Sequence, residues 1–246
     1  LVSGQQTETP LTLANAGVRY PRRNPNYIVY FDAAQTGGGA VMALDRADLD
    51  AQPRTVVDVR YGVPRLFLED KYLLFMERTG EKSYRLNVID LAANEAVTAA
   101  LFDGPAYGVS APSMASGQIL YADASQEDAS QSVIESLQIE TGERWRFEPG
   151  TYVHDPKSNG DCWAWITANH SEDSDLYVSV RGGAPQLIAR GVADFGITNE
   201  AVVYCRDEVI YACLLSDNRS YILSETGART QLVVAVGRHD RVDFDV

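Results

Sequence analysis

The sequence predicts an all-β protein folded as a five-bladed β-propeller. Three observations predict this fold class. A short apolar segment with a central aromatic residue recurs about every 45 residues, and a proline precedes most of these aromatics at a nearly constant distance. No segment keeps a helical period for more than about two turns. Four short strands fit within each repeat, which is the content of a propeller blade.

The apolar segment with its aromatic is the first marker of the repeat. Successive central aromatics are 45, 46, 44 and 46 residues apart, a period that chance rarely keeps over five copies. An uninterrupted apolar run is expected for the second strand of a blade, because neighbouring blades cover both of its faces. The segments are residues 27–31, 72–76, 119–122, 163–166 and 209–212, with Tyr30, Phe75, Tyr121, Trp165 and Tyr211 at their centres.

The second marker is a proline in the preceding strand. Pro21, Pro112 and Pro156 each precede their aromatic by nine residues and Pro64 by eleven, whereas the fifth copy has Val202 at the nine-residue offset. Residues that favour tight turns separate the two strands in every copy. These turns are predicted at residues 24–26, 69–71, 116–117, 158–160 and 206–207.

A third strand, a turn and a fourth strand complete each unit. Third strands are predicted at residues 87–91, 136–139, 176–180 and 221–223, and fourth strands at 55–57, 97–101, 144–147, 186–188 and 231–234. The chain, residues 1–246, is therefore predicted to be one domain. Its repeat units are residues 16–58, 59–103, 104–149, 150–190 and 191–236.

The two ends of the chain leave the number of blades open. Residues 9–14 have the pattern of a fourth strand, and residues 241–246 that of a first strand. Such end strands can close a ring and remove exposed edges. We expect five blades, or six if part of a blade is missing. The chain has neither an initiator Met nor a signal sequence, which leaves open whether a leader or anchor was removed.

Together these markers resemble the repeat of the TolB-like β-propellers, also described as WD40-like or PD40-type repeats. The resemblance runs through residues 64–91, 112–142 and 156–183, with weaker matches from Pro21 and from Glu200 to Gly227. The usual Ser-Pro-Asp-Gly turn of the family is degenerate here. The resemblance implies a propeller that binds something, because the group includes periplasmic scaffolds, surface modules and non-catalytic domains of peptidases.

The charge of the chain excludes several kinds of partner. Lys and Arg number 21 against 34 Asp and Glu, for a net charge of −13. This excess argues against nucleic acid, which is bound by neutralising phosphates, and against anionic lipid. No apolar run is long enough to span a membrane. The three cysteines, Cys162, Cys205 and Cys213, are expected to be small core residues with free thiols. A turn near Asp207 would pair Cys205 with about Glu208 and Cys213 with about Glu200, so these two thiols would not face each other.

One predicted site is an acidic rim at the loops between second and third strands. Asp32, Glu77 and Asp123 each follow their marker aromatic by two residues, and Thr167 and Cys213 take this position in the last two copies. The rim could attract a basic partner or a divalent cation. Alternatively, these acids only keep the loops of an acidic protein soluble.

The other predicted site is the mouth of the central channel. Its residues are Tyr20, Arg60, Tyr61, Tyr107, Tyr152, His154 and Asp155. Aromatic rings beside an Arg, a His and an acid could form a pocket for a sugar or a peptide. The alternative is structural, because Tyr61, Tyr107 and Tyr152 recur three to five residues before their prolines and could plug the channel.

Catalysis is the competing function. Some five-bladed propellers are glycoside hydrolases whose channel carboxylates act as acid and as base or nucleophile. Asp155 could take part, but Tyr20, Val63 and Ala111 at the corresponding positions are not acids. The chain has no Gly-x-Ser-x-Gly motif, His-x-x-x-His spacing, P-loop or dinucleotide fingerprint. We therefore expect no catalytic residue, metal or cofactor.

The predicted function is a non-catalytic binding or scaffold module for a protein, peptide or glycan. A glycoside hydrolase using channel carboxylates is the alternative. From the resemblance and the missing start, we expect the protein to be a monomer outside the bacterial cytoplasm.

Overall fold

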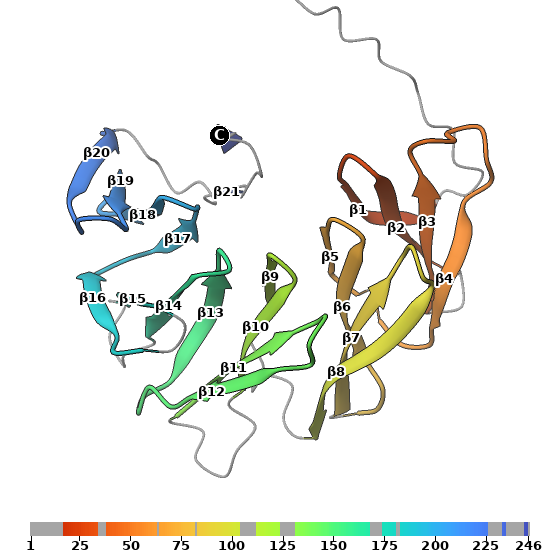
Figure 1. The fold of residues 1–246 in the computed structure, drawn as a ribbon, viewed down its shortest axis with the longest axis horizontal. Helices are drawn as coiled ribbons and strands as arrows, with labels where there is room; N and C mark the ends of the chain where they lie inside the picture. Colours follow the sequence, from red (N-terminus) through yellow and green to blue (C-terminus); the bar gives the residue numbers. More distant parts are fainter. Residues whose placement is uncertain are drawn as a thin grey trace, which may run out of the picture. The chain divides into compact units, whose positions relative to one another are not determined.

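The computed structural model describes residues 17–33, 38–62, 64–81, 83–103, 112–123, 131–167, 174–180 and 183–225, and the pairs 233–234 and 244–245. Within these residues the chain forms strands and turns without a helix (Figure 1). Two compact units can be distinguished. The first comprises Leu1–Glu81 and Arg85–Ala100, and the second Lys82–Tyr84 and Leu101–Val246. That residues 1–246 form one domain stays a prediction.

The first unit contains two four-stranded antiparallel sheets, apart from the first two residues of β7 and the last three of β8. In both sheets the strands neighbour one another in chain order. The first sheet is β1 (Val18–Arg23), β2 (Tyr27–Ala33), β3 (Gly39–Asp45) and β4 (Arg54–Val59). The second sheet is β5 (Leu66–Glu69), β6 (Tyr72–Arg78), β7 (Ser83–Asp90) and β8 (Glu95–Asp103).

The second unit contains three sheets of the same kind, so the five predicted blades are confirmed. The third sheet is β9 (Ser113–Ala115), β10 (Gln118–Asp123), β11 (Val133–Gln138) and β12 (Arg144–Phe147). The fourth is β13 (Val153–Ser158), β14 (Cys162–Thr167), β15 (Asp175–Val180) and β16 (Gln186–Ala189). The fifth is β17 (Asp194–Ile197), β18 (Ala201–Arg206), β19 (Val209–Leu214) and β20 (Ser220–Ser224).

The second strands are buried, as their apolar sequences predict. The central aromatics of β2, β6, β10 and β14 are all at most 5% exposed. Among the described residues, three buried clusters each join two neighbouring sheets. In the first unit Phe31 of β2 packs in one cluster with Phe75 of β6, and in the second unit Leu120 of β10 packs with Trp163 and Trp165 of β14. The second strand of each blade therefore holds neighbouring sheets together.

The fifth sheet corrects one prediction. The sequence pattern assigns Tyr211 to the second strand of this blade, but the second strand is β18 and its aromatic is Tyr204. Tyr204 follows Trp165 by 39 residues, so the last repeat is shorter than the others. Burial explains why β18 is the second strand. Five of its six residues are buried, whereas only two of the six residues of β19 are.

The shift changes two further assignments. Cys205 pairs with Ile210 and Cys213 with Val202, each two residues away from the pairing that the pattern predicts, and all three cysteines are free. Residues 231–234 do not supply the fourth strand, which is β20. Instead β21 (Val233–Val234) pairs with β22 (Phe244–Asp245) in a separate two-stranded ladder. Residues 9–14 lie outside the described part of the chain.

Among the described residues there is no helix with the length and apolar character that a membrane span requires.

Candidate functional site

The first strands of the sheets are the inner strands, because they lie side by side in each unit. β1 neighbours β5 in the first unit, and β13 neighbours both β9 and β17 in the second (Figure 1). Of the predicted channel-mouth residues that the structure describes, Tyr20, His154 and Asp155 lie on these strands, and Arg60, Tyr61 and Tyr152 precede them in the chain. The inner strands therefore position the predicted binding residues of the channel mouth.

Two inner strands carry the same β-bulge. Tyr20 and the proline after it together face Tyr30 across the β1–β2 ladder, and Asp155 and the proline after it face Trp165 across β13–β14. Tyr20 and Asp155 both have φ near +49°, a left-handed value that is uncommon outside glycine. A bulge redirects the side chains beside it, and proline is tolerated there because no ladder hydrogen bond is needed.

The bulge in the second unit brings together three of the predicted residues, Tyr152, His154 and Asp155. The His154 Nδ1 lies 3.2 Å from the Asp155 Oδ2. The rings of Tyr152 and His154 have their centroids 6.4 Å apart and are tilted by 40°. About half of the Asp155 side chain and a third of the His154 side chain are exposed. A carboxylate and two rings therefore face solvent from one inner strand.

Two residues that were not among the predicted site residues complete this group. Lys157 of β13 reaches toward β17, where its ammonium donates to the Phe195 carbonyl, lies 4.4 Å from the centroid of the Phe195 ring, and lies 3.8 Å from the Asp194 Oδ1. Burial lowers the pKa of Lys157, and Asp194 and Asp155 oppose that shift. We call Tyr152, His154, Asp155, Lys157 and Asp194 the inner-strand cluster.

The predicted residues of the first unit are more exposed. Tyr20 is 46% exposed at its bulge, and Tyr61 is 55% exposed after β4, next to an exposed Arg60. Arg22 ties this inner strand to the next, since its Nε donates to the Leu66 carbonyl at 3.1 Å. Tyr107 lies outside the described residues. The first unit therefore presents separate exposed side chains, without the contacts of the inner-strand cluster.

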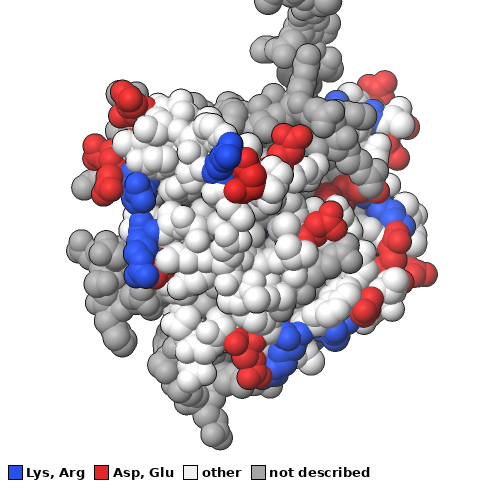
Figure 2. Space-filling view, turned by 60° about the vertical axis from the view of Figure 1, so that its left-hand side comes forward, with Lys and Arg blue, Asp and Glu red and all other residues white. Residues whose placement is uncertain are grey.

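The three rim acids lie at the ends of second strands and are half-buried. Asp32 and Glu77 are the second-to-last residues of β2 and β6, and Asp123 is the last residue of β10. Glu77 accepts a hydrogen bond from the Asn87 Nδ2 at 3.1 Å. In the fifth sheet the aromatic of the second strand is Tyr204, so the residue two positions after it is Arg206 and not Cys213. Figure 2 shows acidic and basic side chains interspersed on the face in view.

Metal-ligating side chains do not gather in the described parts of the chain. No group of three or more His, Cys, Asp or Glu residues there could hold a metal ion. The inner-strand cluster instead offers one imidazole, one phenol, one ammonium and two carboxylates. These groups can bind a polar or charged ligand, and the two acids come from different sheets.

Comparison with known proteins shows the fold. No model of a protein family and no curated protein matches the chain. Among solved structures, the β-propeller domain of the Trilobed protease from Pyrococcus furiosus has a TM-score of 0.67 at 12% identity, over 94% of this chain and 77% of that one. TolB from Acinetobacter baumannii has a TM-score of 0.55 at 14% identity, over 85% and 55%.

A prolyl endopeptidase is similar as well, with a TM-score of 0.63 at 15% identity over 89% of this chain and 38% of that one. The chain spans 38% to 64% of the length of this enzyme, TolB and an oligogalacturonate lyase. At these identities the likeness establishes a TolB-like propeller fold and nothing about activity. The similar structures include a prolyl endopeptidase and an oligogalacturonate lyase as well as TolB.

Proposed function

We propose that the chain is a non-catalytic binding module for a protein partner, and that the inner-strand cluster binds a basic peptide segment of this partner. The observation behind the proposal is the half-exposed Asp155 carboxylate beside the rings of His154 and Tyr152. A carboxylate can accept two parallel hydrogen bonds from an arginine, and a tyrosine ring attracts the same cation.

The position of Lys157 supports this choice of ligand. Its ammonium is directed at the Phe195 carbonyl and ring and lies near Asp194, so its positive charge is engaged within the cluster. The groups that face solvent are then mainly acidic or aromatic. A net charge of −13 adds a field that speeds the approach of a basic partner.

A library of random dodecapeptides displayed on phage tests the proposal. We expect wild-type protein to select peptides rich in Arg or Lys, and Asp155→Asn to bind them at least tenfold more weakly. Asp207→Asn is the matched control, because it removes the same charge at a turn whose side chain is 87% exposed. Selection of acidic peptides, or equal binding by the two variants, would contradict the proposal.

A glycoside hydrolase is the second candidate, favoured by one observation. Asp155 and Asp194 come from different sheets, and both lie near Lys157. Hydrolases of this class need two carboxylates on either side of the scissile bond, whereas here a lysine lies between the acids. Release of reducing sugar from a panel of polysaccharides, lost in both Asp155→Asn and Asp194→Asn, would replace the binding proposal with this one.

We infer that the protein acts outside the bacterial cytoplasm as a monomer. The support is the TolB-like fold together with the acidic composition. Fractionation of the source cells with an antibody against the chain, and light scattering of the purified protein, test location and mass. Recovery in the cytoplasmic fraction would contradict the inferred location. A dimer mass would contradict the inferred monomer.

A further inference from the structure

The second unit has a hollow at the end of its sheets opposite the inner-strand cluster. Its volume is about 370 Å³, within the range of small-molecule sites. It is lined by the turns that join β9 to β10, β11 to β12 and β13 to β14. Because neighbouring strands are antiparallel, these turns are at the other end of the sheets from Asp155. The hollow is therefore separate from the inner-strand cluster.

The side chain of Gln118 identifies the hollow as more than a surface depression. Gln118 is only 3% exposed. Its Oε1 accepts one hydrogen bond from the Ser158 hydroxyl at 2.8 Å and another from the Trp163 Nε1 at 2.9 Å. An indole N–H can only donate, so the atom beside it must be the amide oxygen. The orientation of the amide is thereby determined.

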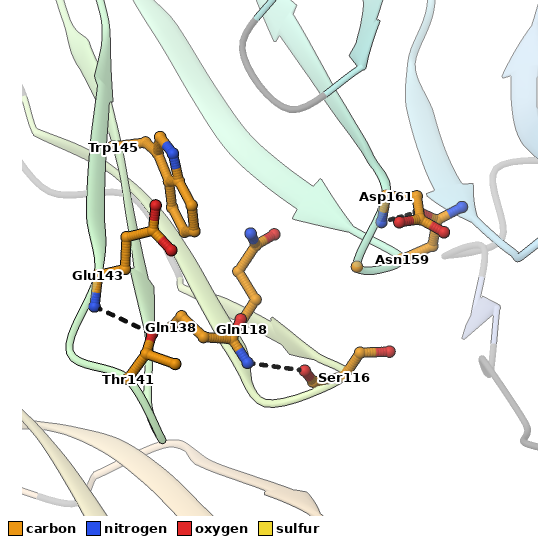
Figure 3. Close-up of a pocket in the computed structure, with 9 residues that line it drawn as sticks. Ser116, Gln118, Gln138, Thr141, Glu143, Trp145, Asn159 and Asp161 are labelled. Atoms are coloured by element: carbon orange, nitrogen blue, oxygen red, sulfur yellow. Dashed lines mark hydrogen bonds between the residues drawn. The ribbon is translucent and has the colours of Figure 1, made fainter.

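The amide nitrogen of Gln118 consequently points into the hollow. Figure 3 shows it turned toward the side where Trp145 and Glu143 lie. Among the described residues, none accepts a hydrogen bond from this nitrogen. An amide nitrogen that borders a hollow can donate to an acceptor that fills it. A ligand with an acceptor at this place would satisfy it.

The rest of the lining shows what else the ligand must offer. The Trp145 indole borders the hollow and rests on the buried cluster of the third and fourth sheets, so its position is held. The carboxylates of Glu143 and Asp161 accept hydrogen bonds, and the lining contains no Lys or Arg. A matching ligand therefore offers a donor to Glu143, an acceptor to Gln118 and an apolar face to Trp145.

We propose that this hollow binds a neutral saccharide. Each sugar hydroxyl can both accept a hydrogen bond from Gln118 and donate one to Glu143. The C–H face of a pyranose ring matches the flat indole of Trp145. An anionic sugar or a phosphate would meet two carboxylates and no cation. A simple ammonium ion would suit the acids but leave the Gln118 nitrogen without an acceptor.

The test measures binding of methyl glycosides of glucose, galactose and mannose, N-acetylglucosamine and cellobiose to the whole chain, by calorimetry and saturation-transfer NMR. Gln118→Glu keeps the acceptor for Ser158 and Trp163 but turns the donor in the hollow into an acceptor. Glu143→Gln removes one acid at an exposed position and should leave the fold intact. Gln186→Glu, on exposed β16 and outside the lining, is the matched control.

We expect at least one sugar to bind, with affinity at least tenfold lower in Gln118→Glu and Glu143→Gln and unchanged in Gln186→Glu. If Gln118→Glu does not fold, Glu143→Gln decides. Failure of every sugar to bind folded wild-type protein would overturn the proposal. So would binding that neither variant weakens, or binding of tetramethylammonium in place of the sugars. None of these outcomes depends on the peptide proposal, whose variants alter the other end of the unit.

Discussion

At the scale of single residues, the hydrogen bond between Tyr121 and Glu135 allows a prediction of pH dependence. The buried Tyr121 hydroxyl donates to the Glu135 Oε2 at 2.6 Å. Burial, and then the neighbouring Glu135, raise the pKa of Tyr121 above its ordinary value of 10.0. Because the folded pKa is the higher one, the stabilisation is complete below about pH 10 and is lost as the pH rises further.

We expect Tyr121→Phe to lower the free energy of unfolding by about 1.5–3 kcal/mol at pH 7, the range for a hydrogen bond to a charged group. The difference between wild type and variant should shrink above pH 10. Urea unfolding at pH 7 to 11 measures both. Tyr61→Phe, at a half-exposed tyrosine, is the control and should change little. A difference that stays constant up to pH 11 would show that Tyr121 does not titrate as described.

The residues of the candidate sites differ in how far the sequence can predict them. Tyr152, His154 and Asp155 are neighbours on one strand, so a strand assignment is enough to place them together. Lys157 meets Asp194 only because β13 packs against β17, and that contact depends on three-dimensional packing. Gln118 has no motif at all. Its importance comes from the Trp163 indole, 45 residues away, which orients its amide.

At the scale of elements, the bulges explain the proline marker in two of the blades. Pro21 and Pro156 lie nine residues before their aromatics because they face them across a bulged hairpin, whereas Pro64 and Pro112 lie just before β5 and β9. The pattern failed in the fifth blade, where no proline marks the first strand and the repeat is shorter. The apolar run of residues 201–205 was the remaining signal, and the assumption of a constant period concealed it.

The left-handed conformation at the bulge can be tested at Tyr20, which has φ near +49°. Asparagine tolerates this region, whereas a β-branched residue is strongly disfavoured there. We expect Tyr20→Val to be about 1–2 kcal/mol less stable than Tyr20→Asn, the usual cost of this conformation for an L-residue. Urea unfolding of the two variants measures the difference. Equal stabilities would indicate an ordinary extended strand without the bulge.

The register of the fifth sheet can be tested with a new cysteine. Cys213 lies directly across from Val202 in the structure, and the shifted pairing predicted from the sequence places it near Glu200. Directly paired residues have Cβ atoms close enough for a disulfide. We expect mild oxidation to consume two thiols in Val202→Cys but none in the control Glu200→Cys. Thiol titration in denaturant distinguishes them, and the reverse outcome would restore the sequence-based register.

At the scale of the whole molecule, the net charge of −13 has a consequence independent of any site. Acidic and basic side chains are interspersed on the face in Figure 2, so the excess is not confined to one patch of that face. Like charges repel more strongly in the compact state. Salt screens this repulsion, because the Debye length falls from about 30 Å at 0.01 M to about 8 Å at 0.15 M ionic strength.

We therefore expect the chain to become more stable when NaCl is raised from about 0.01 M to 0.15 M. A gain of about 1 kcal/mol corresponds to a rise in Tm of about 2–4 °C for a protein of this size. Calorimetric scans at the two salt concentrations measure it. A double variant, Asp50→Asn with Glu95→Gln, removes two exposed acids and should show a smaller rise. A Tm that falls with salt would mean that attractive ion pairs, such as Lys71 with Asp90 at 2.8 Å, outweigh the repulsion.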